Sequence, residues 1–543
     1  MKRLTILAAS LALGAMACAA PTQQPSQTND NQPKSGGYVN VRAIIDPFDW
    51  DLSYVGKSSP NGWGQATAYE SLLGFKDGED VKYHEMVLEP QLAESWEVSP
   101  DARTYTFHLR KGVKWADMAP VNGREFTSAD VKWSYEYWTR TGWAKDKNLP
   151  QGQFDAMFEG ITGIETPDPY TAVVKFKDPF VPFVAYAASD YNPIVPNEIY
   201  DQDGHLHDKI AGTGAFQLDT ANTQKGTRWV WKKNANYRQP GKPYLDQVRW
   251  VVVPDDAAAV AAFQAKQVDQ LESSALSRRT VDDISKSSPD AIIYPYQLPV
   301  GWHLYLQVQK PPFNDVRIRK ALAYSIDRDE LSLTLDGAKS GWAPSGAMLG
   351  LFTDEEAHQM LRYDPAEAKK LLTEAGFPNG IDITWEFPGK AYGDNYISGI
   401  ELMQAQAKKA GINFTLKSID KDAFSSKRKL KDFSIHMVSN SCGGLNEEYD
   451  AVVYGCYKSG SKGNYADVQD PQLDGLLNAE RAETNPEKRI EALRAAVRRI
   501  NEQVYAINTV YQPRWEVWAS ALHGYRPHLG SKGQNMTGAW VTR

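Results

Sequence analysis

The chain has 543 residues, 42% of them hydrophobic and 23% charged, which is an ordinary balance for a globular protein with a large core. Its 60 lysine and arginine residues are scattered and are outnumbered by 67 acidic residues, which argues against nucleic acid as a partner. After the N-terminal leader no apolar run is long enough to span a bilayer, so we expect no further membrane span.

The first 18 residues have the pattern of a secretory signal. A basic start at Lys2 and Arg3 precedes an apolar stretch too short to cross a bilayer, and small residues then lead to Cys18. Residues 19–37 are polar and contain prolines, a composition that cannot bury enough surface to fold. We therefore expect an exported protein with a signal at 1–18 and a disordered linker at 19–37.

The leader also resembles a bacterial lipoprotein signal, in which the cysteine after the cleaved bond becomes lipid-modified. On this resemblance Cys18 carries a lipid that anchors the chain to a membrane. Lipoprotein signals usually place leucine three residues before the cysteine, where this chain has Ala15. Ordinary cleavage after Ala17 or Ala19 therefore remains open.

The three cysteines suggest one disulfide. Because Cys18 is either used by the anchor or removed with the signal, Cys442 and Cys456 remain in an oxidising compartment. A bond between them would close a short loop and stabilise the fold by ~3 kcal/mol in the loop-entropy account. Two free buried thiols are the alternative.

The folded part is predicted to open with β structure. Residues 38–45 form a short β-like stretch, and a β-hairpin is predicted at 91–110. In its second strand Tyr105, Phe107 and Leu109 alternate with polar residues, as expected of a half-buried strand.

Helix starts are marked by capping residues. The predicted caps are Thr127, Asp327, Asp364 and Asn485, and a first-turn proline follows the last two. Strand-rich blocks come early, and helices and strands alternate from about 314 to 502. This order predicts a mixed α/β chain, and about 500 folded residues correspond to three domains or two large lobes.

Five blocks of sequence identify a family. Leu-Ala-Glu-Ser-Trp at 92–96, the segment 105–115 and the helix start at 126–131 closely resemble the signature of the family 5 extracellular solute-binding proteins. These are the large peptide- and nickel-type receptors of ABC importers. These three segments form the first block, and the other four blocks follow in the family's order at 212–218, 231–237, 314–328 and 363–377.

The resemblance implies a two-lobed periplasmic-binding-protein fold of type II, with a hinge, an extra subdomain and a ligand cleft between the lobes. Lobe I would comprise 38–290, with the subdomain at about 60–180, and 500–543. Lobe II would comprise 291–499.

The implied function is a monomeric receptor in the periplasm or at the outer face of the cytoplasmic membrane. It would capture a short peptide and deliver it to permease subunits that a separate ATPase drives. An oligosaccharide, an opine-like compound or a nickel chelate is the alternative ligand. No cofactor is expected.

Two departures from the peptide-binding pattern concern charged groups. In peptide-binding relatives an aspartate in a segment resembling 433–444 binds the ligand amine, but here that segment has no acidic residue. The nearest carboxylates are Glu447, Glu448 and Asp450, for which a solvated loop is the alternative, and Asn440 is the polar candidate inside the segment. Relatives place an arginine after the strand matching 383–388, where this chain has Lys390, a point charge without bidentate geometry.

The aromatic residues, with 16 Trp and 27 Tyr, suit a protein that grips a ligand with large rings. For any single ring a place in the core is the alternative. The rings in segments that line the cleft of relatives are Tyr69, Trp302, Trp385, Tyr392 and Tyr396.

A secreted hydrolase is the rival class, but the sequence has no G-x-S-x-G, H-E-x-x-H or P-loop motif. We therefore expect no enzymatic activity. His205 and His207 are close in sequence, and His303 and His436 occupy segments that line the cleft in relatives, yet the nine histidines show no metal-ligand spacing. No metal site is expected.

Overall fold

The computed structural model describes residues 32–47, 49–51, 64, 66–147, 149, 155–271, 276–336, 339–392, 394–438, 448–530 and 536–542. The predicted leader with Cys18 and the linker as far as residue 31 lie outside this range. Residues 32–37 lead into the first strand without forming a helix or a strand. Within the described residues every helix is too short or too polar to cross a membrane.

One eight-stranded sheet runs through both halves of the molecule. In sheet order its strands are β15 (Ile435–Val438), β12 (Ile292–Leu306), β16 (Ala506–Trp518), β11 (Gln270–Leu271), β1 (Tyr38–Ala43), β10 (Gln247–Val252), β9 (Arg228–Lys233) and β8 (Phe216–Leu218). The predicted β-like start of the fold is confirmed as β1, which pairs in parallel with β10 and β11.

A second sheet lies in the N-terminal half, with the order β4 (Ala93–Val98), β5 (Thr104–Leu109), β7 (Thr171–Phe176) and β6 (Ile161–Asp168). The predicted hairpin is confirmed, because β4 and β5 pair antiparallel and Tyr105, Phe107 and Leu109 are the buried residues of β5. Helix α2 (Ser128–Thr139) packs on β6 and β7. The backbone N–H of its cap Thr127 donates to Asp130 at 2.9 Å, as the capping signal predicts.

Short elements complete this half: β2 (Leu73–Phe75), β3 (Leu88–Pro90), η1 (Gly142–Ala144), η2 (Asp155–Phe158), α3 (Phe183–Tyr186), α4 (Asn197–Asp203), α5 (Asp256–Gln264), α6 (Arg278–Ser287), β17 (Leu522–His523) and β18 (Trp540–Val541).

The other half is mainly helical around a parallel strand pair, β13 (Ile381–Phe387) and β14 (Ile412–Ser418). Its helices are α7 (Val316–Ser325), α8 (Arg328–Asp336), α9 (Asp354–Met360), α10 (Pro365–Glu374), α11 (Asp394–Lys409), α12 (Lys421–Lys429), α13 (Tyr449–Tyr457), α14 (Pro471–Ala482) and α15 (Pro486–Gln503). The predicted caps are confirmed, since Asp327, Asp364 and Asn485 each accept a bond from the backbone three residues on.

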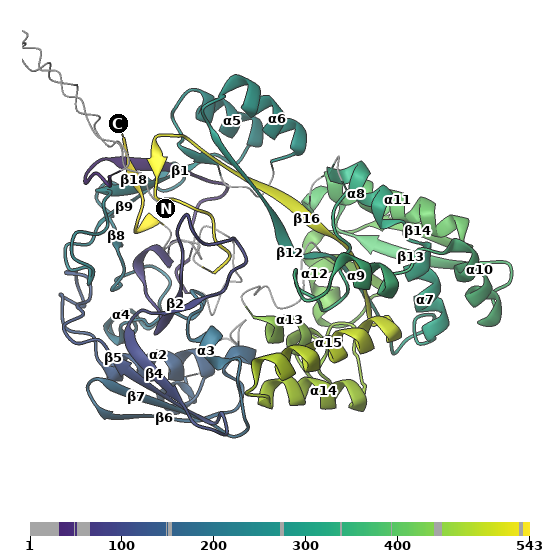
Figure 1. Cartoon of the computed structure of the whole chain (residues 1–543), viewed down its shortest axis with the longest axis horizontal. Helices are drawn as coiled ribbons and strands as arrows, with labels where there is room; N and C mark the ends of the chain where they lie inside the picture. Colours follow the sequence, from purple (N-terminus) through teal and green to yellow (C-terminus); the bar gives the residue numbers. More distant parts are fainter. Residues whose placement is uncertain are drawn as a thin grey trace, which may run out of the picture.

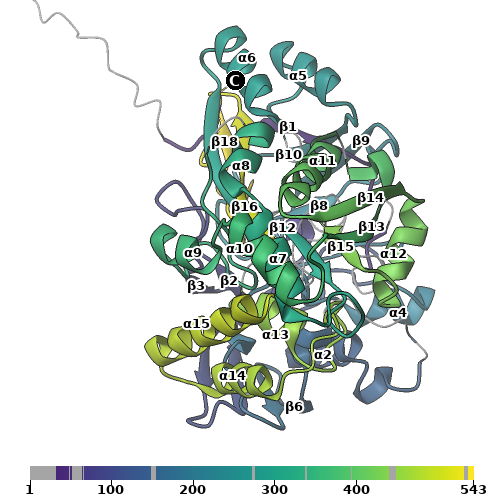
Figure 2. The same ribbon diagram turned by 90° about the vertical axis from the view of Figure 1, so that its right-hand side faces the viewer.

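The chain has two large hydrophobic cores, one in each of the two bodies that the ribbon forms in Figure 1. One gathers buried side chains from residues 39–250 and 518–541, and the other from residues 302–507. A smaller core packs α5 and α6 against β16. Figure 2, in which the second half faces the viewer, shows α14 and α15 side by side along its lower edge. We keep the proposed division into lobe I (38–290 and 500–543) and lobe II (291–499).

The strands β12 and β16 connect the lobes as a long antiparallel pair (Figure 1). Their register shifts between Gln297 and Gly301 and again between Gly301 and His303. Gly301 is required there, because a Cβ atom at this position would lie 2.5 Å from the Val510 carbonyl oxygen. The irregular pairing lies where the two strands cross between the lobes, which is where we place the hinge of the two-lobed fold.

Strand β16 also carries a buried acid, Glu516, in lobe I. The Tyr525 hydroxyl donates to its Oε1 at 2.7 Å, and the Gln270 side-chain amide donates to the same oxygen. Burial raises the pKa of the Glu516 carboxyl from 4.5 to about 7, against the opposing effect of these two hydrogen bonds.

We predict that Glu516→Gln stabilises the protein above neutral pH. Below about pH 4.5 the folded and unfolded chains both hold the proton, but between pH 4.5 and 7 only the unfolded chain releases it. The wild type therefore loses up to ~3 kcal/mol of stability as the pH rises through this window, and the amide does not. Melting temperatures from pH 4 to 8 should show a growing advantage for the variant.

The matched control is Glu502→Gln at an exposed position of α15, which should show no such trend. An advantage of Glu516→Gln that stays constant over the whole pH range would contradict the assignment of a raised pKa to Glu516.

Candidate ligand-binding site

The segment 439–447, which contains Asn440, Cys442 and Glu447, lies outside the described residues, but the structure describes both of its attachment points. On one side β15 is buried at all four positions and pairs with β12 from His303–Val438 to Leu306–Ile435. On the other side Glu448 begins α13. The lobe II core therefore holds the segment at both ends.

Two of the predicted rings meet beneath the end of β15. The Tyr396 hydroxyl donates to the Met437 carbonyl at 2.9 Å, and the Tyr396 ring packs edge-on against Trp302 with centroids 6.0 Å apart. Helix α11 approaches closely through Gly399, where a Cβ atom would lie 2.2 Å from the Trp302 ring. Both rings are buried, so they pack under the end of β15, the strand to which segment 439–447 is attached. Ligand contact by either ring stays a prediction.

The other predicted rings lie apart from this pair. Trp385 is fully buried in the lobe II core, edge-on to Phe414 at 5.2 Å. Tyr69 is buried in the lobe I core, where its hydroxyl accepts a bond from the Ala211 N–H at 3.3 Å. The side chain of Tyr392, the last residue of η4 (Gly389–Tyr392), lies outside the described part of the chain.

Lys390 is the predicted partner for a ligand carboxylate. It lies on η4, which directly follows β13, and its side chain is exposed. Among the described residues it forms no ion pair within 4.0 Å, in contrast to Lys417 and Lys427, which both bind Glu386. Its ammonium group can therefore meet an anion without first breaking an ion pair to any of the described residues.

The structure gives protein partners to two of the predicted acidic residues. Glu448 caps α13 by accepting from the Asp450 N–H at 3.3 Å, and it binds Arg489 at 2.6 Å. Asp450 accepts two bonds from Arg481, at 2.6 and 2.9 Å, and one from the Tyr186 hydroxyl at 2.7 Å. A ligand amine would have to compete with these ion pairs.

Burial and neighbouring charges set the ionisation of this acidic cluster. Burial alone would raise the pKa of Asp450, but the Arg481 guanidinium holds that pKa below its ordinary value. Glu480 lies beside Asp450, and burial together with the Asp450 charge raises the pKa of Glu480 well above its ordinary value. The cluster therefore favours the ionised form of Asp450 and disfavours the ionised form of Glu480.

The histidines are engaged in packing and local pairs. His207 Nδ1 lies 2.9 Å from the Asp49 carboxylate. Burial lowers the pKa of His303 to about 4, and burial together with Arg428 lowers that of His436 to about 2. Across the described residues no three His, Cys, Asp or Glu side chains are grouped to hold a metal ion.

Cys456 is disulfide-bonded and fully buried. Its predicted partner Cys442 lies outside the described residues, so the pairing of these two cysteines stays a prediction.

The sequence reasoning missed Tyr186 and Arg481, which lie at the contact between the lobes. No motif marks Tyr186. Arg481 had a usable signal, since the buried face of α14 consists of Leu473, Leu477, Glu480 and Arg481. Two charged residues on an otherwise apolar helical face indicate buried partners.

We predict that Glu448→Gln and Arg489→Gln each lower the free energy of unfolding by about 2–3 kcal/mol. Arg489→Gln leaves the buried Glu448 without its cation, and Glu448→Gln removes the closer of the two carboxylates that Arg489 binds, leaving it with Glu480 at 3.1 Å. The double variant should lose less than the sum of the two. Denaturant unfolding checks this, with Glu487→Gln at an exposed site of α15 as the control. Unchanged stability of Glu448→Gln combined with lost ligand binding would instead assign Glu448 to the ligand.

Comparison with known proteins identifies the family to which this two-lobed architecture corresponds. A family model described as bacterial extracellular solute-binding proteins, family 5 Middle, matches residues 87–464. The dipeptide-binding protein of Escherichia coli (strain K12) is 28% identical over 542 residues, which cover 94% of this chain and 95% of that protein.

Solved structures share the fold. The periplasmic binding protein DppA from Helicobacter pylori, in complex with the peptide STSA, gives a TM-score of 0.78 at 22% identity and covers 94% of this chain and 99% of its own. AgaA from A. tumefaciens R10, in complex with agropinic acid, gives 0.77 at 23% identity and covers 93% and 99%. The family model spans well over half of the residues, and the chain belongs to the bacterial extracellular solute-binding proteins of family 5.

Proposed function

We propose that this chain is the extracytoplasmic receptor of an ABC importer and that it captures a short peptide between its lobes. The observation that carries the proposal is the position of β15 and α13, the two elements between which segment 439–447 is attached. The chain leaves the lobe II core at β15 and returns at α13, directly beside the contact that Asp450 makes with lobe I. The likeness to a dipeptide-binding protein over 94% of the chain supports a peptide as the ligand.

In this proposal the receptor works by enclosure and performs no chemistry. The lobes close about the β12–β16 hinge, and the enclosed ligand is held by polar groups in a site from which water is excluded. Asn440 and Glu447 are the proposed contacts for the ligand amine, and Lys390 is the proposed contact for its carboxylate. The loaded receptor, acting as a monomer, then docks on permease subunits whose energy comes from a separate ATPase.

A second ligand class has specific support. The peptide-type aspartate is absent from 433–444, and the carboxylate partner is a lysine in place of an arginine. A likeness of TM-score 0.77 to a receptor that holds agropinic acid points to small opine-like acids as the alternative. Lys390 serves either ligand, because both carry a carboxylate.

We predict that short peptides with a free carboxylate raise the melting temperature of the purified receptor by mass action. Amidation of the peptide's C-terminus should weaken binding to the wild type about tenfold, since a charged hydrogen bond is lost. Lys390→Ala should bind the free and amidated peptides equally well. Lys409→Ala, which alters an exposed lysine at the end of α11, is the matched control and should discriminate like the wild type.

Equal binding of free and amidated peptides by the wild type would remove Lys390 from the site. Stabilisation by opine-like acids alone would assign the second ligand class. Cleavage of a peptide without any stabilisation would favour the hydrolase.

We also propose that Cys18 carries a lipid that keeps the receptor at the membrane near its permease. Cys18→Ser should move the protein from the membrane fraction to the soluble extract, because the acyl chains that hold it there are missing. Fractionation and the intact mass of the mature wild type check this. A soluble wild type whose sequence starts after Ala17 or Ala19 would establish ordinary cleavage.

A further inference from the structure

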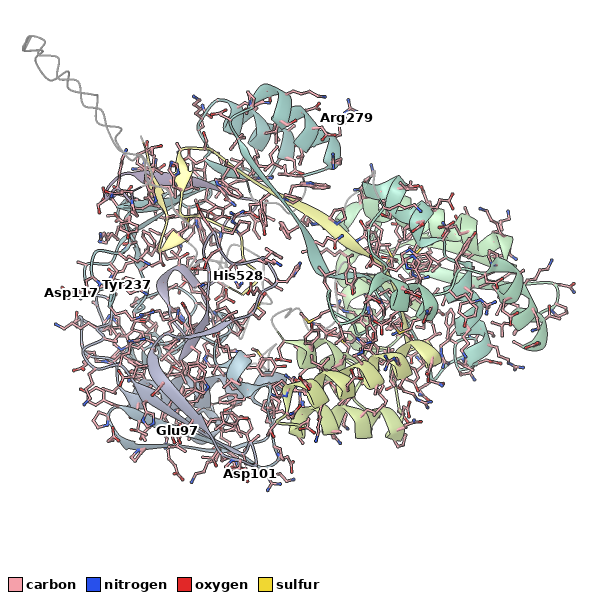
Figure 3. The ribbon with its side chains drawn as sticks, in the orientation of Figure 1. Glu97, Asp101, Asp117, Tyr237, Arg279 and His528 are labelled. Carbon is pink, nitrogen blue, oxygen red and sulfur yellow. The ribbon has the colours of Figure 1, made fainter. Side chains whose placement is uncertain are left out.

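The lobes touch at a second place besides the hinge. There α3 and the residues before it, on lobe I, lie against α13 and α14 of lobe II (Figure 1). The Tyr186 hydroxyl donates to Asp450 Oδ2 at 2.7 Å, and the Val181 N–H donates to the Arg481 carbonyl at 2.8 Å. Arg481 Nη1 also donates to Glu159 at 3.0 Å. Figure 3 shows this part of the molecule with its side chains and labels Asp101, which lies between β4 and β5 of lobe I.

This contact excludes water. Tyr186 is 3% exposed and Asp450 1%. The Arg481 guanidinium lies over the Tyr454 ring of lobe II and, at 4.7 Å from its centroid, over the Phe180 ring of lobe I. Ala451, which follows Asp450, packs into the core of lobe I. Hydrogen bonds to an ionised carboxylate in such surroundings are stronger than bonds between neutral groups in water.

The charges are distributed so that this contact can open. Arg481 binds Asp450 through two bonds within lobe II, so the ion pair stays complete when the lobes separate. Lobe I contributes the neutral groups of Tyr186 and Val181, together with the exposed Glu159. Opening therefore leaves no buried charge without a partner, which would cost several kcal/mol. A contact of this composition is strong while the lobes are closed, and it can break and form again as the lobes open and close.

We propose that Tyr186, Asp450 and Arg481 form an interlobe latch that stabilises the closed conformation of the receptor. They are positioning residues and act through the geometry of the lobes. The latch is connected to the proposed ligand segment, because Asp450 follows Glu448, the residue at which segment 439–447 ends. The Asp450 carboxylate, a candidate for the ligand amine on sequence grounds, here binds the other lobe.

A second trio of the same chemistry lies around the core of residues 302–507, away from the contact between the lobes, and serves as an internal control. Asp470 accepts from Arg499 at 2.8 Å and from the Tyr505 hydroxyl at 2.8 Å. Asp470 and Tyr505 are buried, and Tyr505, although it follows the proposed boundary at residue 499, packs in the hydrophobic core of residues 302–507. Tyr505→Phe therefore removes a buried Tyr–Asp bond without touching the contact between the lobes.

The test compares Tyr186→Phe with Tyr505→Phe in the ligand-free mature protein. Hydrogen exchange of the Val181 amide reports the latch directly, because its acceptor lies on the other lobe, and X-ray scattering reports lobe separation. Tyr186→Phe should speed exchange at Val181 about tenfold and increase the radius of gyration. Tyr505→Phe should lower the melting temperature yet leave both quantities at their wild-type values.

Three results would overturn the latch: wild-type exchange and radius in Tyr186→Phe, the same loss of protection in Tyr505→Phe, or a Val181 amide that already exchanges freely in the wild type. Glu159→Gln, an exposed and fold-neutral change, should shift both readouts in the same direction by a smaller amount, and no shift would also count against the latch. The role of the latch in holding a ligand rests on the proposed receptor function, but the existence of the latch does not. Its readouts need no ligand, so failure of the peptide proposal leaves them interpretable.

Discussion

The pairing of β12 with β16 is the constraint on which the rest of this structure depends. These two strands carry the chain from lobe I into lobe II and back, and they place strands of both lobes in one sheet. Backbone hydrogen bonding keeps the connection in register, while the shifts around Gly301 break that register where the lobes meet. The paired strands therefore hold the two lobes together, and the irregular pairing around Gly301 leaves one place about which the lobes can rotate.

The second contact between the lobes, formed by Tyr186, Asp450 and Arg481, complements this hinge. At Asp450 and Arg481 the ion pair belongs wholly to lobe II, whereas the hydroxyl that completes it comes from Tyr186 in lobe I. A receptor needs a closed state that is stable enough to hold a ligand and an open state that costs little to reach. Keeping the buried charges on one side of the contact meets both needs.

Local sequence signals predicted the helix caps and the hairpin, but they could not predict contacts between residues that are far apart in the sequence. The β4–β5 hairpin and the caps at Thr127, Asp327, Asp364 and Asn485 follow from residues within a few positions of one another. The sequence neighbours of Asp450 indicate a loop of acids near the ligand, and a ligand contact by Asp450 stays a prediction. Its actual partners are 31 and 264 residues away, and no local pattern reveals that distance. The rings divide for the same reason: Trp302 and Tyr396 meet under β15, while Trp385 and Tyr69 lie in the cores of different lobes.

A crystal structure of the mature receptor with its bound ligand is the decisive experiment for the claim that the two lobes enclose the ligand. We expect electron density for a ligand with a free carboxylate, enclosed between the lobes beside segment 439–447. Lys390 should lie at the carboxylate, and the Tyr186–Asp450 hydrogen bond should be intact. A ligand bound on one lobe alone, or enclosed while Asp450 has left Tyr186 to bind it, would contradict that claim.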